Sequence, residues 1–156
     1  MQSKDILKLI LKGRTMLKAI KRIYLFAGIY GVLVLAPMYF MERQAGIDAP
    51  PAITHPEFYY GFIGVALAAQ VMFFIISRDP VRFKPLMIVA MLEKVSFGVA
   101  AIVLLSQGRI PMNMFLGGCV DLLLMCLFAF AYFKTPSYQP QDSFKNAGQP
   151  QLQESF

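Results

Sequence analysis

Three ionisable side chains lie deep inside long apolar runs of the sequence: Glu93, Lys94 and Asp121. Placing one Lys or Asp at the centre of a membrane-spanning helix costs about 2.5–3.5 kcal/mol, so such residues rarely face lipid. They usually face the protein interior, pair with one another and mark the path of a proton, an ion or a ligand. We therefore expect the three side chains to lie inside a helix bundle and to find partners there.

The spacing of these residues allows them to meet across a helical hairpin. Lys94 lies fifteen residues before Arg109, where the chain turns, and Asp121 lies twelve residues after it. If both runs are helical, the depths of Lys94 and Asp121 in the membrane differ by about 4–5 Å, which a lysine side chain can span. Gln70, in the middle of another apolar run, is a candidate to complete a polar cluster.

Small residues share the helical faces of the charged side chains. Those on the face of Lys94 are Ala90, Gly98 and Ala101, and those on the face of Asp121 are Gly117 and Gly118. Small residues mark the faces on which helices approach one another closely in lipid. The charged faces are therefore predicted to be helix-packing faces as well.

Two interpretations of the cluster remain open. Two acids and one base carry a net charge of −1 when all are ionised, which is costly in a membrane, so we expect one carboxyl to hold a proton at neutral pH. An acid kept neutral in this way can serve as a proton relay or a general acid. Alternatively, Lys94 and Asp121 form a structural ion pair that fixes the helix register, and Glu93 is neutral and hydrogen-bonded.

No other group of residues has the composition of a metal or cofactor site. His55 and Glu57 lie close together in a polar segment, but two ligands do not make a metal site. Cys119 and Cys126 would be about 10 Å apart on one helix, too far for a disulfide bond. The sequence contains no phosphate-binding loop, nucleophile elbow or haem-attachment motif. We expect no metal and no cofactor.

The composition indicates an integral membrane protein. Of the 156 residues, 57% are hydrophobic and 15% are charged, against about 25% charged in soluble domains. Four apolar runs are long enough to cross the bilayer, and they predict an all-α, up-down bundle of four membrane helices over residues 23–41, 57–77, 85–106 and 112–133. Pro37 is expected to bend or fray the end of the first span. Residues 42–56 are predicted to form a polar, proline-rich loop without regular helix.

Two further segments flank the predicted bundle. Residues 1–22 have the pattern of a basic amphipathic helix that lies in the lipid headgroup plane, with Lys4, Lys8, Lys12, Arg14 and Lys18 on the lipid surface. The alternative is a helical cytoplasmic extension packed on the rest of the protein. Residues 134–156 are rich in Pro, Gln and Ser, which predicts a disordered cytoplasmic tail.

The distribution of positive charge predicts the orientation. With the N-terminus inside, twelve Lys and Arg residues lie on the inner side of the membrane and only Arg43 and Arg109 on the outer side. This bias predicts that both termini are cytoplasmic. The net charge of +6 is concentrated before the first span, which indicates contact with anionic lipid and not with nucleic acid.

The second half of the chain resembles a known kind of protein. The resemblance rests on the Glu93–Lys94 pair, the QGRIP turn that contains Arg109, and Asp121 before a closing Lys134. These features, over about a third of the chain, look like those of small uncharacterised bacterial four-helix membrane proteins, distantly similar in layout to the DoxX-like group. The resemblance implies a four-helix bundle in the bacterial inner (plasma) membrane, and it implies no reaction.

The sequence supports three hypotheses about function. The first is a non-enzymatic accessory or structural subunit that joins itself, as a homo-oligomer, or a larger membrane complex through its small-residue faces. The second is a membrane-embedded lipid or small-ligand site, a proton-coupled carrier or an isomerase-like enzyme, using Glu93 and Asp121. The third is a membrane anchor whose basic helix recruits anionic lipid.

Overall fold

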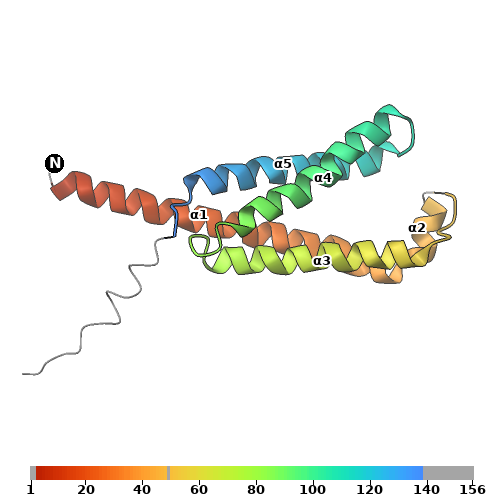
Figure 1. Ribbon diagram of the computed structural model, residues 1–156, viewed down its shortest axis with the longest axis horizontal. Helices are drawn as coiled ribbons and strands as arrows, with labels where there is room; N and C mark the ends of the chain where they lie inside the picture. Colours follow the sequence, from red (N-terminus) through yellow and green to blue (C-terminus); the bar gives the residue numbers. More distant parts are fainter. Residues whose placement is uncertain (1–2, 49, 139–156) are drawn as a thin grey trace, which may run out of the picture.

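The computed structural model describes residues 3–48 and 50–138, and within these ranges every regular element is a helix (Figure 1). The elements are α1 (Ser3–Leu35), the 3₁₀-helix η1 (Ala36–Phe40), α2 (Glu42–Asp48), α3 (Pro56–Arg78), α4 (Leu86–Ser106) and α5 (Met112–Lys134). Four segments are long and apolar enough to cross a bilayer: Leu11–Phe40, Pro56–Arg78, Leu86–Ser106 and Met112–Lys134. The prediction of an all-α chain with four helices able to span a membrane is confirmed.

Prolines set the beginnings of several helices. Pro37 lies in the first turn of η1, where the α-helical geometry of α1 gives way to the tighter 3₁₀ geometry. Pro56 is the first residue of α3, where its missing N–H costs no hydrogen bond. Pro85 and Pro111 immediately precede α4 and α5.

A glycine ends α4 and makes the turn to α5 possible. Gly108 has a φ of +66°, a conformation that side chains with a Cβ rarely adopt. The amides of Gly108 and Arg109 donate hydrogen bonds to the carbonyl oxygens of Leu105 and Leu104, respectively. This pair of bonds is the Schellman arrangement, which satisfies carbonyl groups that the helix end would leave unpaired.

Two boundaries differ from those that the sequence predicts. The described part of the predicted N-terminal helix, residues 3–22, and the first span are one continuous helix, α1, because the change from a charged to an apolar composition at residue 22 does not interrupt the backbone hydrogen bonding. The prediction that residues 42–56 lack regular helix is wrong for Glu42–Asp48, which form α2. Prolines restrict their own residue and the one before it, so Pro50 and Pro51 leave this segment free to be helical. The predicted tail lies outside the described residues from residue 139 onward.

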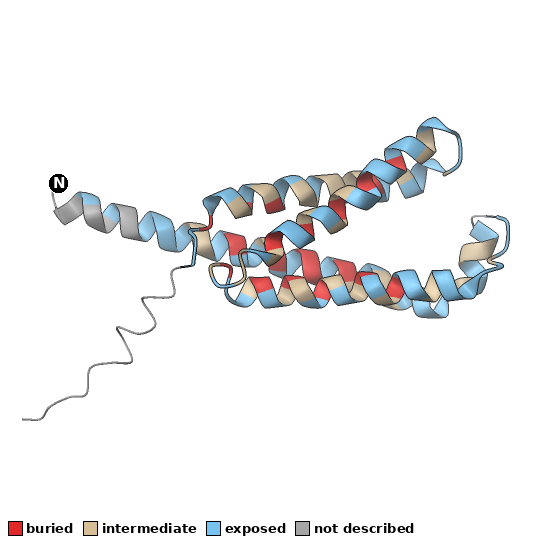
Figure 2. Ribbon diagram, viewed as in Figure 1, coloured by how far each residue is buried: buried red, intermediate tan, exposed pale blue. Residues whose placement is uncertain are grey.

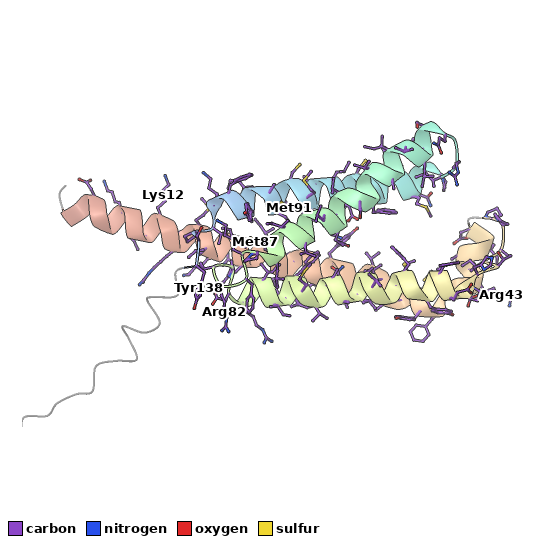
Figure 3. The ribbon with its side chains drawn as sticks, viewed as in Figure 1. Lys12, Arg43, Arg82, Met87, Met91 and Tyr138 are labelled. Carbon is purple, nitrogen blue, oxygen red and sulfur yellow. The ribbon has the colours of Figure 1, made fainter. Side chains whose placement is uncertain are left out.

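The four long helices form two antiparallel hairpins, α1–α3 and α4–α5. Within each hairpin the helices pack closely, whereas contact between the hairpins is much less extensive. The hairpins lie together near the α3–α4 turn, which we call the closed end (Figure 1). They diverge toward the α4–α5 turn and α2, which we call the open end. Figure 3 shows Arg82 at the closed end and Arg43, in α2, at the open end.

The buried core lies toward the closed end, where all four helices meet (Figure 2). Three aromatic rings, one from each of α1, α3 and α5, form its centre. The rings of Tyr24 and Phe128 stack with centroids 4.4 Å apart, and the Phe73 ring packs edge-on against Phe128 at 5.0 Å. Aliphatic and small side chains surround the rings, namely Ile20, Ala27, Ile76, Met87, Ala90 and Ala131.

A lysine ties the α3–α4 turn to the end of α5. Lys84 Nζ donates a hydrogen bond of 2.6 Å to the carbonyl oxygen of Thr135 and lies 4.9 Å from the ring centroid of Tyr132. The Thr135 hydroxyl donates to the carbonyl oxygen of Ala131, one turn earlier in α5. These contacts join segments fifty-one residues apart in the sequence and hold the hairpins together at the closed end.

Candidate functional site

The three ionisable residues predicted from the sequence meet between α4 and α5. Lys94 Nζ lies 3.2 Å from Asp121 Oδ1, and it lies 3.2 Å from Oε1 and 3.1 Å from Oε2 of Glu93. The Lys94 side chain is 8% exposed, while those of Asp121 and Glu93 are 17% and 27% exposed. The predicted buried Lys94–Asp121 ion pair is therefore present, and Glu93 shares the same ammonium group.

Close approach of the two helices is what brings Lys94 within reach of Asp121. A Cβ added to Gly118 would lie 2.5 Å from the Cβ of Ala101, and one added to Gly98 would lie 2.6 Å from two carbon atoms of Leu122. A side chain at Gly118 would force the helices apart, and one at Gly98 would displace the Leu122 side chain. Ala90 is also fully buried, in the core at the closed end.

Gly117 occupies a different position from the other small residues predicted for helix packing. It is exposed, and a Cβ added to it would meet no atom within 4 Å. Gly118, the next residue, carries the contact with α4, because successive residues on a helix point about 100° apart. The close packing of α5 on α4 thus uses one glycine of the pair, and the other lies on the outward face.

An aromatic ring connects the ion cluster to the α1–α3 hairpin. Lys94 Nζ lies 5.5 Å from the ring centroid of Phe73, which is fully buried in α3. A cation at this distance from a ring face is attracted by the ring's quadrupole, more strongly when both groups are removed from water. Phe73 also belongs to the aromatic core, so the charged cluster lies directly beside the contact between the hairpins.

Glu93 and Asp121 share one ammonium group. Glu93 Oε1 accepts a hydrogen bond from Lys94, but Glu93 Oε2, although close to the same ammonium group, lies outside hydrogen-bond geometry and is buried. A single ammonium group cannot neutralise two carboxylates. The cluster therefore has one acid more than it has bases, as the sequence indicates.

Gln70 is not joined to this cluster by any hydrogen bond in the part of the chain that the structure describes. Its amide nitrogen donates to the Ala66 carbonyl oxygen at 2.8 Å, and its amide oxygen has no donor. That oxygen lies against Gly31, at the place a Cβ would occupy, so Gln70 packs α3 on α1 instead. The buried hydroxyl of Tyr24 likewise has no hydrogen-bond partner among the described residues. The sequence does not predict this, because a tyrosine on an apolar helix face looks like any other core aromatic residue.

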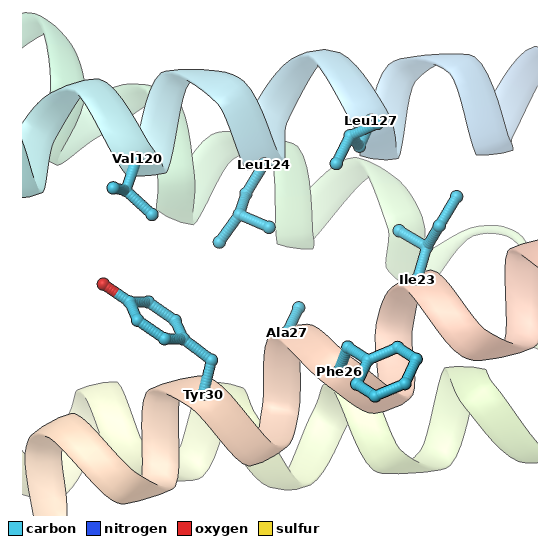
Figure 4. Close-up of a pocket in the computed structure, with 7 residues that line it drawn as sticks. All are labelled: Ile23, Phe26, Ala27, Tyr30, Val120, Leu124 and Leu127. Carbon is cyan, nitrogen blue, oxygen red and sulfur yellow. The ribbon is translucent and has the colours of Figure 1, made fainter.

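A cleft of about 320 Å³ lies between α1 and α5 (Figure 4). Its α1 wall consists of Ile23, Phe26, Ala27 and Tyr30, which recur at helical spacing. Its α5 wall consists of Val120, Leu124 and Leu127. No member of the ion cluster lines it. The sequence shows the two apolar faces, but it does not show that they oppose each other across a gap.

The remaining predicted positions lie apart from the cluster. The side chains of Lys8, Lys12, Arg14 and Lys18 are exposed on α1, whereas that of Lys4 lies outside the described residues. His55 Nδ1 lies 3.0 Å from Glu57 Oε1 in an exposed pair. Among the side chains that the structure describes, no group of three or more His, Cys, Asp or Glu is placed to hold a metal ion. Cys119 and Cys126 are both free thiols.

No family model, no curated protein and no solved structure matches this chain. Any conclusion about function therefore rests on the geometry of the cluster and of the helices around it. Chemically, the cluster has two capabilities: the ion pair can fix the register of α4 against α5, and the excess acid can take up or release a proton.

Proposed function

We propose that the protein is a small, non-enzymatic subunit of a membrane assembly, formed with copies of itself or with a larger complex. The observation that carries the proposal is that the three charged side chains of the cluster contact one another and not the cleft. Lys94 is 6% exposed and is held by both acids, and none of the three side chains lines the cleft. A group that acts on a ligand must come within hydrogen-bond reach of it. Because its charged groups pair with one another, the cluster serves instead to fix the packing of α4 on α5.

Outward-facing glycines support this proposal by offering places for a neighbouring helix. Gly117 on α5 and Gly61 on α3 are exposed, and a Cβ added to either would meet nothing within 4 Å. In lipid, helices associate through such small residues because the backbones can approach closely there. Gly98 and Gly118 are already used inside the α4–α5 hairpin, so the outward glycines are those left for assembly.

Native electrophoresis and native mass spectrometry of the full chain in mild detergent test this proposal. We expect a mass larger than one chain, with or without a second protein, and we expect Gly117→Leu to shift it toward the monomer. Gly13→Leu, which also adds a side chain where nothing lies within 4 Å, is the matched control because Gly13 follows Lys12 in the part of α1 that extends past the bundle (Figure 3). A wild-type chain that is monomeric under all mild conditions would contradict the proposal.

Glu93 favours a second candidate, a proton site within the membrane. Its Oε2 is buried without a hydrogen-bond donor among the described residues, in a cluster of two acids and one base. If the protein conducts protons, liposomes loaded with a pH-sensitive dye should change pH under an imposed potential, and Glu93→Gln should abolish the change while the unfolding temperature is unchanged. Absence of flux in the wild type, with Glu93→Gln and Asp121→Asn only less stable, would leave the structural subunit as the sole proposal.

We also propose the orientation and location that the charge bias and the resemblance to bacterial four-helix membrane proteins indicate. The protein would lie in a bacterial inner membrane with both termini in the cytoplasm. Reporter fusions after residue 138 and within residues 42–56 test this. We expect a cytoplasmic reporter to be active only at the first site and a periplasmic reporter only at the second. The reverse pattern would exclude this orientation.

A further inference from the structure

The cleft between α1 and α5 lies within the hydrocarbon layer if the helices span the membrane. Its residues on α1 lie inside the candidate span Leu11–Phe40, and those on α5 lie inside Met112–Lys134. Six of the seven lining side chains are wholly apolar, and Tyr30 contributes a ring with one hydroxyl group (Figure 4). The molecules that reach such a surface from the bilayer are acyl chains and the helices of other proteins.

The charges beside the cleft decide between these two occupants, because a phospholipid carries a charged headgroup at the membrane surface. The cleft has a volume of about 320 Å³. An acyl chain is thin and flexible, and it can enter from the side because the cleft is open to the surroundings at Phe26, which is 66% exposed.

Two lysines extend the walls of the cleft toward the membrane surface. Lys12 precedes Ile23 by eleven residues, about three helical turns, so it lies on the same face of α1 about 16 Å away along the axis. Lys134 follows Leu127 by seven residues, about two turns, and lies on the same face of α5 about 10 Å away. The two helices run in opposite directions, so Lys12 lies beyond the closed end of the bundle (Figure 3). Lys134 lies at the closed end, next to Thr135, whose carbonyl oxygen accepts a hydrogen bond from Lys84.

Both lysines are exposed, and neither forms an ion pair with any residue that the structure describes. Their positive charges are therefore available to a headgroup. One leaflet contributes about half of the ~30 Å hydrocarbon layer, so a chain whose headgroup lies near Lys134 extends about 15 Å into the membrane. Ten residues of α5 span the same length, which places the chain beside Leu124, in the middle of the cleft.

We propose that this cleft binds an anionic phospholipid, with one acyl chain between α1 and α5 and the phosphate near Lys12 and Lys134. The acyl chain replaces the missing helix–helix contact between the two hairpins, and the lysines select for a headgroup with net negative charge. A zwitterionic headgroup places its own cation beside the lysines and is bound less well. The bound lipid thus fills the side of the bundle between α1 and α5.

Native mass spectrometry of the full chain, taken from nanodiscs with equal phosphatidylglycerol and phosphatidylcholine, tests the proposal. We expect one phosphatidylglycerol per chain, preferred over phosphatidylcholine roughly tenfold or more, since each lysine near the surface favours anionic lipid. Val120→Phe should fill the cleft and abolish retention. Val65→Phe is the matched control, because Val65 is 74% exposed on α3, and it should retain the lipid.

A second pair of variants tests the headgroup contact without touching the core. Lys12→Gln with Lys134→Gln should bring retention of the two lipids close to equal, whereas Arg43→Gln with Arg109→Gln, at the other end of the helices, should leave the preference unchanged. The proposal is wrong if the wild type retains no lipid or both lipids equally, or if Val120→Phe retains as much as Val65→Phe. It is also wrong if Val120→Phe removes a second protein chain in place of a lipid.

Discussion

The two hairpins hold their helices together by different means. In α4–α5, one ion pair and two glycines, Gly98 and Gly118, lie within about two turns of each other and carry the close contact. In α1–α3, the contact is spread along the helices. Gly28 faces the ring of Phe74, and a Cβ added to Gly28 would lie 2.7 Å from that ring. Gly31 faces the side chain of Gln70.

Hydrogen bonds at the open end complete the α1–α3 hairpin. The Tyr59 hydroxyl donates to the carbonyl oxygen of Met38, and that of Tyr60 donates to Glu42, both at 2.8 Å. The Tyr60 ring also stacks on Tyr39 with centroids 5.9 Å apart. The neutral hydrogen bond and the ring pair each contribute about 1 kcal/mol, and the hydrogen bond to the Glu42 carboxylate contributes about 1.5–3 kcal/mol, so the stabilisation is divided among several contacts. The comparison predicts that single substitutions separate α4 from α5 far more easily than α1 from α3.

Removal of the shared cation is the change with the largest expected effect. Lys94→Met leaves Asp121 and Glu93 buried without a counter-charge, and breaking a buried pair in this way costs about 3–5 kcal/mol. Unfolding of the purified protein in mixed micelles, followed by circular dichroism against the fraction of denaturing detergent, measures the loss. If Lys94→Met lowers the free energy of unfolding by less than about 1 kcal/mol, the α4–α5 hairpin does not depend on this pair.

A compensating variant shows whether the charge or the shape matters. Replacement of buried ionic groups by apolar or neutral ones of similar volume is often neutral or stabilising. Lys94→Met combined with Asp121→Leu and Glu93→Gln should therefore recover most of the stability that Lys94→Met alone loses. If the triple variant is as unstable as the single one, packing of the Lys94 side chain on Phe73 is the dominant contribution and not the ion pair.

A pair of adjacent glycines provides the next test of the comparison. Gly118→Leu forces a side chain into Ala101 and should cost about 1–3 kcal/mol, because overpacking moves the backbones apart. Gly117→Leu is the same substitution one residue away on the open face, and it should leave the unfolding free energy of the isolated chain unchanged. The same micelle titration, under conditions in which any assembly is dissociated, distinguishes the two. Equal losses would mean that α5 is rotated relative to the geometry described above.

The sequence predicts the parts of this site that follow from large energies. A bilayer excludes unpaired charge, so Lys94 and Asp121 have to meet, and the helical repeat together with the turn at Arg109 indicates where. The four spans are predicted for the same reason, since apolar length is a strong signal. The C-terminal boundary of α4 is also predictable, because Gly108 and Pro111 restrict the backbone on either side of the turn.

Features that depend on small energy differences could not be predicted. The sequence places Gln70 in the middle of an apolar span without showing which helix it faces, and the packing of α3 on α1 places it against Gly31. The outward direction of Gly117 depends on a rotation of α5 by a fraction of a turn. The divergence of the two hairpins depends on how whole helices pack, which no local pattern in the sequence records.

The smallest expected effect is at the open end of the α1–α3 hairpin. Tyr59→Phe removes one hydrogen bond to the Met38 carbonyl oxygen while keeping the ring, and a bond of this kind contributes about 0.6–1.5 kcal/mol. Tyr30→Phe is the control, because the Tyr30 hydroxyl donates no hydrogen bond to another described residue. This variant should leave the unfolding free energy in lipid-free micelles unchanged. Amide hydrogen exchange across η1 and α2 should rise in Tyr59→Phe and not in α5. A loss above about 3 kcal/mol would show that the α1–α3 hairpin also depends on a single contact, and the contrast between the hairpins would not hold.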